Sequence, residues 1–218
     1  MPQERFMLRV GALAGALAVL LLVLMILIGL QIGPDLEHLS SLSPTRVAAL
    51  FVNSQDKLRL MMAIDDLFAL AYVIAFIGLA MYAKPRAPLL AWFGLGFALA
   101  TGVLDWLENS ITLGLISYTL TSPRLVMSAT TTPPLSAEQL LALNIVTQIK
   151  FLAANGAVAL FGIGIWNACR LNRAAAILFW LFVPLNTLAF VSAPLASVRI
   201  LGMLVLLVVG AIVLWKSE

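Results

Sequence analysis

Six apolar segments divide the chain, and their length is the feature that most restricts how it can fold. They run at about 10–30, 61–83, 89–106, 141–166, 174–192 and 200–215. Each is long enough to cross a hydrocarbon core of roughly 30 Å at about 1.5 Å of helical rise per residue. Only 11% of the 218 residues are charged, against 62% hydrophobic. The sequence therefore predicts an all-α, polytopic membrane protein in which residues 1–218 form a single domain of six transmembrane helices.

Positive charge gathers at alternate connections, which predicts how the helices are oriented. The connections at 84–88 and 169–173 are short and basic, and with Arg5, Arg9 and Lys216 they carry seven of the thirteen cations. Because cytoplasmic loops are enriched in Lys and Arg, both termini should be cytoplasmic. Nine arginines against four lysines, with abundant Ala and Leu, favour a bacterial source and hence the inner membrane.

The two longer connections, 31–60 and 109–140, should form a small, partly helical cap on the periplasmic or extracellular side. Ser43-Pro44 is typical of an N-cap followed by proline at the first helical position. Residues 136–139, Ser-Ala-Glu-Gln, form a capping box just before the fourth segment. Residues 121–134 are rich in Thr, Ser and Pro, which predicts an irregular stretch that is either a lid or an ordinary loop.

Ionisable residues interrupt three of the predicted spans. The second span carries Asp65 and Asp66, the third carries Asp105 and Glu108, and the fourth carries Lys150. Asp65, Asp105 and Lys150 each lie 19 or 20 residues from the nearest inner cation, or about 28–30 Å along a helix. We therefore expect all three at one level near the outer interface, where a charge costs less than at the midplane.

Helical spacing places most of these residues on faces that should point into the bundle. On the third span, Ala98, Thr101, Asp105 and Glu108 follow a 3.6-residue repeat, and small residues on such a stripe allow a neighbouring helix to approach. We expect the second, third and fourth spans to enclose an acidic pocket that opens to the outer leaflet. Its predicted lining is Asp65, Asp66, Asp105, Glu108, Asn109, Gln148 and Lys150.

The chemistry of this pocket favours a binding or transport protein. Its ligand would be a cation, a proton-coupled solute or a lipid headgroup, with Asp105 and Glu108 as central ligands and Lys150 balancing the charge. A hard metal ion such as Ca²⁺ or Mg²⁺ would take Asp65, Asp105 and Glu108 as its oxygen ligands. Whether a metal binds, which residues would be catalytic, and which ligand is bound all stay open at this point.

Two other classes of function fit the same residues. An enzyme acting on lipid-linked substrates would use one carboxylate as general base and a protonated neighbour as acid. Residues 102–105, Gly-Val-Leu-Asp, resemble the G-x-G-D motif of intramembrane aspartyl proteases but lack its second glycine. A non-catalytic accessory subunit would instead bind a partner through its lipid-facing helices and cap. Its charged residues would then be structural, with Lys150 and Arg59 pairing with the acids to fasten the outer helix ends, and such structural ion pairs also perturb charged groups.

Composition excludes several further classes. The only histidine is His38 and the only cysteine is Cys169, which excludes multi-histidine metal centres, bis-histidine haem and an intrachain disulfide. No basic run is interleaved with aromatic residues, so nucleic acid is not an expected partner. We expect no cofactor, and the sequence leaves the oligomeric state open.

Overall fold

The computed structural model describes residues 2–36, 42–121, 135–166, 170–189 and 193–217. Seven α-helices lie within these ranges: α1 Pro2–Ile32, α2 Pro44–Asn53, α3 Gln55–Ala83, α4 Pro88–Thr121, α5 Ala137–Ile165, α6 Arg170–Leu188 and α7 Ala193–Trp215. His38, Cys169 and the predicted irregular stretch from residue 122 onward lie outside the described residues.

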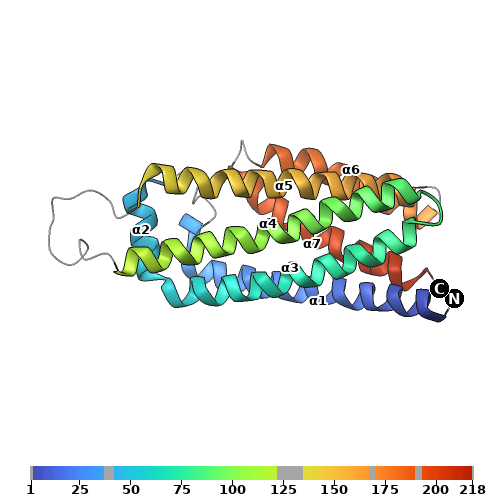
Figure 1. Cartoon of the computed structure of the whole chain (residues 1–218), viewed down its shortest axis with the longest axis horizontal. Coiled ribbons are helices and arrows are strands. Elements are labelled where there is room, and N and C mark those ends of the chain that lie inside the picture. The colour runs from blue at the N-terminus through green and yellow to red at the C-terminus, as the bar shows by residue number, and fades with distance from the viewer. Residues whose placement is uncertain (1, 37–41, 122–134, 167–169, 190–192, 218) are drawn as a thin grey trace.

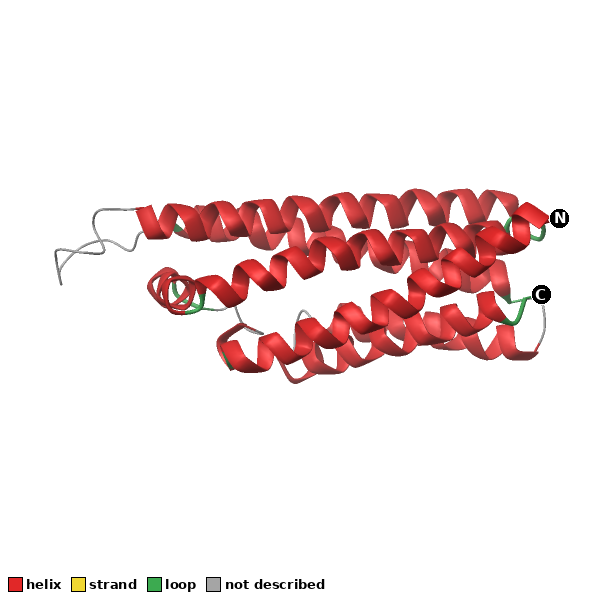
Figure 2. Cartoon of the chain, turned by 90° about the horizontal axis from the view of Figure 1, so that it is seen from below, coloured by secondary structure: helices red, strands yellow, loops and turns green. Residues whose placement is uncertain are grey.

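Six of the helices form a closed ring that follows the order of the chain. α1 packs against α3, and each helix from α3 to α6 then packs against the next one along the chain. α7 closes the ring by contacting α1. The short helix α2 runs across one end of this bundle, where it contacts α3 and α4, and Figure 2 shows it end-on. Both termini lie at the opposite end (Figure 1).

Five of the helices are long and apolar enough to cross a membrane. These candidate spans are Glu4–Ile32, Gln55–Ala83, Pro88–Thr121, Ala137–Ile165 and Val198–Trp215. α6 is not among them in the part of the chain that the structure describes, and it carries Asn172, Arg173, Pro184 and Asn186. A multi-pass membrane protein is therefore indicated, whereas a sixth span and cytoplasmic termini stay predictions.

The helix that contains the third predicted span is longer than that span. α4 does not stop at Trp106 but continues to Thr121, so residues 109–121 continue the same helix and do not form a separate connection. Its polar side chains do not break the helix because they bond to carbonyls one turn back, as Thr112 does to Glu108 at 2.9 Å and Thr119 does to Leu115 at 2.8 Å. Asp105 consequently lies near the middle of a 34-residue helix.

Both predicted helix starts are confirmed. The Ser43 hydroxyl accepts a hydrogen bond from the backbone N–H of Arg46 at 3.4 Å, and Pro44 is the first residue of α2. At the start of α5, the Ser136 hydroxyl accepts from the Gln139 N–H at 3.2 Å, and the Gln139 side chain accepts from the Ser136 N–H at 2.9 Å. These bonds satisfy backbone donors that would otherwise lack partners in the first turn.

Small residues allow the closest approach between helices in the ring. A Cβ added to Gly11 on α1 would lie 2.9 Å from the Cα of Gly78 on α3, a distance shorter than van der Waals contact. The two backbones therefore touch where neither residue has a side chain, as is common between membrane helices. This contact helps to fix α1 beside α3 on one side of the ring.

Candidate functional site

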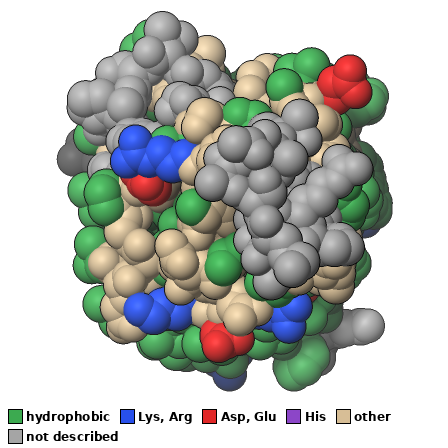
Figure 3. All heavy atoms as spheres, turned by 90° about the vertical axis from the view of Figure 1, so that its left-hand side faces the viewer, with side chains coloured by type: hydrophobic (Ala, Val, Ile, Leu, Met, Phe, Trp, Pro, Cys, Tyr) green, Lys and Arg blue, Asp and Glu red, His purple; other side chains and the backbone are tan. Residues whose placement is uncertain are grey.

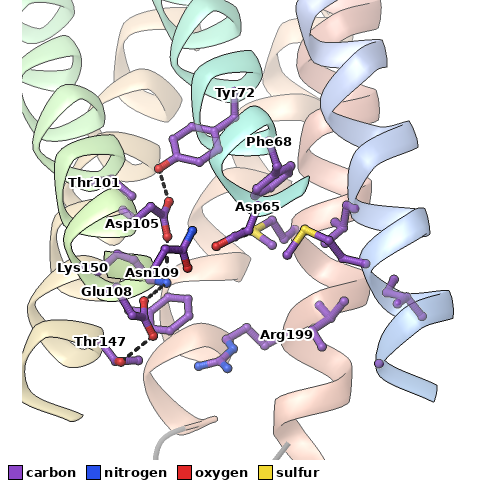
Figure 4. Close-up of a pocket in the computed structure, with 18 of the residues that line it drawn as sticks. Asp65, Phe68, Tyr72, Thr101, Asp105, Glu108, Asn109, Thr147, Lys150 and Arg199 are labelled. Atoms are coloured by element: carbon purple, nitrogen blue, oxygen red, sulfur yellow. Dashed lines mark hydrogen bonds and ion pairs between the residues drawn. The ribbon is translucent and has the colours of Figure 1, made fainter. Parts of the chain in front are cut away.

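A cavity of about 950 Å³ occupies the centre of the ring. Most of its wall is apolar, but charged side chains from α3, α4, α5 and α7 enter it at neighbouring levels (Figure 4). We call these five residues, Asp65, Asp105, Glu108, Lys150 and Arg199, the charged layer. The volume lies near the upper end of the roughly 300–1,000 Å³ that small-molecule sites occupy, so the cavity has room for a large ligand.

Asp105 lies at the centre of a hydrogen-bonded network. It is 5% exposed, and its Oδ1 lies 2.8 Å from the Lys150 Nζ on α5. Its Oδ2 accepts a hydrogen bond from the Tyr72 hydroxyl on α3. Both carboxylate oxygens are thus held by neighbouring helices, which explains how this residue can be buried within an apolar bundle.

Lys150 joins this carboxylate to a second one. Its Nζ also pairs with the Oε2 of Glu108, while the Oε1 of Glu108 accepts a hydrogen bond from the Thr147 hydroxyl at 2.6 Å. Because a buried ion pair stabilises a fold only when the remaining polar atoms are also satisfied, Tyr72 and Thr147 complete the arrangement. We call the five residues that make these contacts the Lys150 clamp: Tyr72 on α3, Asp105 and Glu108 on α4, and Thr147 and Lys150 on α5.

The neighbouring residues Asp65 and Asp66 occupy different environments because consecutive residues are about 100° apart around a helix. Asp65 lines the cavity and points into it beside Asn109 (Figure 4). Asp66 is not part of the cavity wall, and its Oδ1 accepts a hydrogen bond from the Asn109 Nδ2 at 2.9 Å. The pair therefore divides into one residue that faces the cavity and one that connects α3 to α4.

The structure brings most of the predicted site residues together, with Gln148 as the outlying member. Gln148 is exposed at the edge of the cavity, and its Nε2 lies 3.4 Å from the Oδ1 of Asn144 on the same helix. Arg59 is exposed on α3 and takes no part in the Lys150 clamp. Of the two cations considered for a structural role, Lys150 alone contacts the acids.

A second buried polar cluster connects α5 to α6. The Asn186 Nδ2 donates to the Oδ1 of Asn155 at 2.7 Å, and the Asn155 Nδ2 donates to the Thr187 hydroxyl at 3.2 Å. Neither asparagine lines the cavity. These bonds connect Asn155 to two residues of α6 and so help to hold α6 beside α5.

The charged layer includes a cation that sequence reasoning missed. Arg199 on α7 lines the cavity, and its guanidinium lies 4.1 Å from the centroid of the Phe151 ring. The Lys150 Nζ lies 4.9 Å from the same centroid, so both cations contact one aromatic ring. In the sequence Arg199 only precedes an apolar run, a position typical of a boundary cation. Tyr72 and Thr147 were also missed, although Tyr72 follows Asp65 by seven residues on one helical face.

The arrangement of the carboxylates does not resemble a metal site. Among the described residues, no group of three or more His, Cys, Asp or Glu side chains is placed to hold a metal ion. Asp105 and Glu108 on α4 both pair with Lys150, whereas Asp65 lies on α3 and points into the cavity beside Asn109 (Figure 4). With three carboxylates and two cations, the layer carries an excess of negative charge when every group is ionised.

Comparison with protein-family models, curated proteins and solved structures finds no match to this chain. The cavity and its charged layer are therefore the observations from which the function must be inferred.

Proposed function

We propose that this multi-pass membrane protein binds an amphiphilic ligand inside its ring of helices. The observation that supports this function is a large cavity whose apolar wall is interrupted by a charged layer. An inorganic cation would occupy a small part of about 950 Å³ and would gain nothing from the apolar wall. A molecule with a hydrocarbon part and a polar headgroup matches both kinds of surface.

The headgroup would meet the residues of the charged layer that lie outside the Lys150 clamp. The clamp already engages Asp105 and Glu108, so it serves as a fixed part of the wall. Asp65 and Arg199 also line the cavity, one on α3 and the other on α7. They are the charged side chains best placed to select a headgroup.

The same contacts favour binding over acid–base catalysis. A general base must reach the substrate proton within hydrogen-bonding distance. Asp105 instead directs one oxygen to Lys150 and the other to the Tyr72 hydroxyl. Binding is also the step on which any transport of the ligand would depend.

Mass spectrometry of the intact protein, released from mild detergent, tests this function. The wild type should retain an amphiphile at about one molecule per chain. Gly29→Trp should lose it, because Gly29 lines the cavity and an added Cβ there would meet only Leu36, at an ordinary 3.6 Å. Gly96→Trp is the matched control, since an added Cβ at Gly96 meets nothing within 4 Å. A wild type that retains no amphiphile, or equal retention in both variants, would contradict the proposal.

A further inference from the structure

The ring is not closed along its whole length, because α6 and α7 are shorter than their neighbours. α6 has 19 residues and α7 has 23, whereas α5 has 29 and α1 has 31. α5 therefore exceeds α6 by about 15 Å at 1.5 Å of rise per residue. Figure 1 shows α6 ending partway along the bundle, while α1 and α5 continue toward α2. In the half of the bundle nearest α2, the described residues of α6 and α7 do not lie between α1 and α5 (Figure 1).

The exposure of the cavity wall locates an opening at this gap. Among the described residues that line the cavity, the exposed ones are Leu30 and Pro34, at the end of α1 and just beyond it, and Gln148 on α5. The other described residues of the lining are buried or half-buried. Since a residue that both lines a cavity and is exposed marks the place where the cavity meets the surface, the opening lies between α1 and α5.

The surroundings of this opening are suited to lipid. Leu27 and Leu30 on α1 are 52% and 73% exposed, and Leu141 and Ile145 on α5 are 57% and 47% exposed. In the described part of the end that carries α2, a few charged side chains lie among apolar and backbone atoms (Figure 3), and Arg46 there pairs with Asp35 at 3.0 Å. Exposed apolar side chains therefore border the opening on both helices, beside the polar side chain of Gln148, and a ligand would reach it from within the bilayer.

Inside the opening, the two charges outside the clamp lie in a definite order. Arg199 lies on the side of Glu108 and Thr147, and Asp65 lies deeper, toward Tyr72 (Figure 4). Stacking on Phe151 limits the freedom of the Arg199 guanidinium, whose planar set of donors matches phosphate oxygens. The Asp65 carboxylate accepts hydrogen bonds, which suits a primary ammonium group.

We infer that the ligand is a zwitterionic phospholipid that enters sideways between α1 and α5 with its headgroup first, an inference that rests on the proposed function. Its phosphate lies at Arg199 and its amine lies deeper, against Asp65. Its acyl chains remain along the apolar wall near the opening, which includes Ile26 and Leu30 on α1 and Leu140 and Leu143 on α5.

Charge balance favours this headgroup over the simpler ones. A lipid whose headgroup carries only a phosphate would bring an anion toward three carboxylates, and one that carries only an amine would bring no anion to the planar donors of the Arg199 guanidinium. In a zwitterionic headgroup the phosphate lies next to the acyl chains and the amine lies beyond it. Because Arg199 lies nearer the opening and Asp65 lies deeper, the phosphate meets Arg199 and the amine meets Asp65 (Figure 4). Such complementary charges give specificity as well as affinity.

Competition between two lipids tests the inference. The delipidated protein is titrated in detergent with phosphatidylethanolamine and phosphatidylglycerol of identical acyl chains, and bound lipid is measured by mass spectrometry. The wild type should prefer phosphatidylethanolamine by about tenfold or more, the effect of one hydrogen bond between charged groups. Arg199→Gln should weaken phosphatidylethanolamine binding by a similar factor, and Asp65→Asn should abolish the preference. Arg173→Gln, an exposed arginine on α6, is the control and should change neither quantity.

A phosphatidylethanolamine with a photoreactive acyl chain tests the route of entry. Crosslinks should map to the apolar wall of α1 and α5 near the opening, and the Arg199→Gln variant should reduce them. Equal binding of both lipids by the wild type, or crosslinks confined to the outer faces of the helices, would overturn the inference while leaving the proposed function standing. Binding of no lipid in either experiment would instead remove the proposed function itself.

Discussion

Removing the cation at the centre of the Lys150 clamp should strongly destabilise the fold. In the Lys150→Met variant, Asp105 and Glu108 would remain on α4 without the positive charge that lies between them. Methionine keeps the length and the apolar stem of lysine, so the change removes charge with little loss of packing. The variant therefore isolates the electrostatic contribution of the clamp.

The burial of the three side chains sets the size of the effect. The side chains of Asp105, Lys150 and Glu108 are 7%, 13% and 20% exposed, so both ion pairs that Lys150 makes are largely buried. Breaking a buried ion pair by removing one partner costs about 3–5 kcal/mol because the other charge is left uncompensated. Because the Glu108 side chain is partly exposed to water, we expect a value at the lower end of this range, a loss of about 3 kcal/mol in the free energy of unfolding.

Unfolding in mixed detergent micelles, followed by tryptophan fluorescence, measures this loss. Lys216→Met, at an exposed lysine near the C-terminus, is the control and should stay within about 0.5 kcal/mol of the wild type. Neutralising all three residues together, as Asp105→Asn, Glu108→Gln and Lys150→Met, should recover most of the stability, because no charge of the Lys150 clamp is then left without its partner. A Lys150→Met variant as stable as the control, or a triple variant as unstable as the single one, would refute the reasoning.

Two further changes should also lower stability in the same unfolding assay. Tyr72→Phe removes the hydroxyl that donates to Asp105 and should lower the free energy of unfolding by about 1.5–3 kcal/mol, as for other hydrogen bonds to charged groups. Tyr118→Phe, at a half-exposed tyrosine on α4, is the control and should be close to neutral. Equal effects of the two substitutions would argue against the hydrogen bond. Gly11→Val should separate α1 from α3 and lower stability, since its Cβ would lie 2.9 Å from a backbone atom of Gly78. Gly96→Val is the control, because a Cβ added there meets no neighbour within 4 Å. A smaller loss of stability at Gly11 than at Gly96 would count against the close contact.

The elements that the sequence predicted well depend on local chemistry. The helix starts at Ser43 and Ser136 were predictable because an N-cap is recognised from a few neighbouring residues. Long apolar runs likewise predicted helices, because in lipid the backbone polar groups must be satisfied within the segment. The length of α4 was not predicted because Asn109 and Thr112 resemble the start of a loop, whereas in the helix both side chains are buried and hydrogen-bonded, Asn109 to Asp66 and Thr112 to the Glu108 carbonyl.

The site was predictable only in part because its geometry depends on which helices become neighbours. Periodicity placed Asp105 and Glu108 on a face that points into the bundle, and depth placed Lys150 at their level, although helical spacing put it off the polar face of its own segment. These three residues do meet. Arg199 could not be assigned in this way, since the ring closes through a contact between α7 and α1 that no local pattern indicates. The cavity has the same origin, because its walls come from helices that are distant in the chain.

An experimental structure of the protein in nanodiscs, formed from lipids that contain phosphatidylethanolamine, tests the central claim most directly. The account predicts density for one phospholipid inside the ring, with its headgroup between Arg199 and Asp65 and its chains directed to the opening between α1 and α5. A cavity closed by repacked side chains, or lipid found only on the outer faces of the helices, would contradict it.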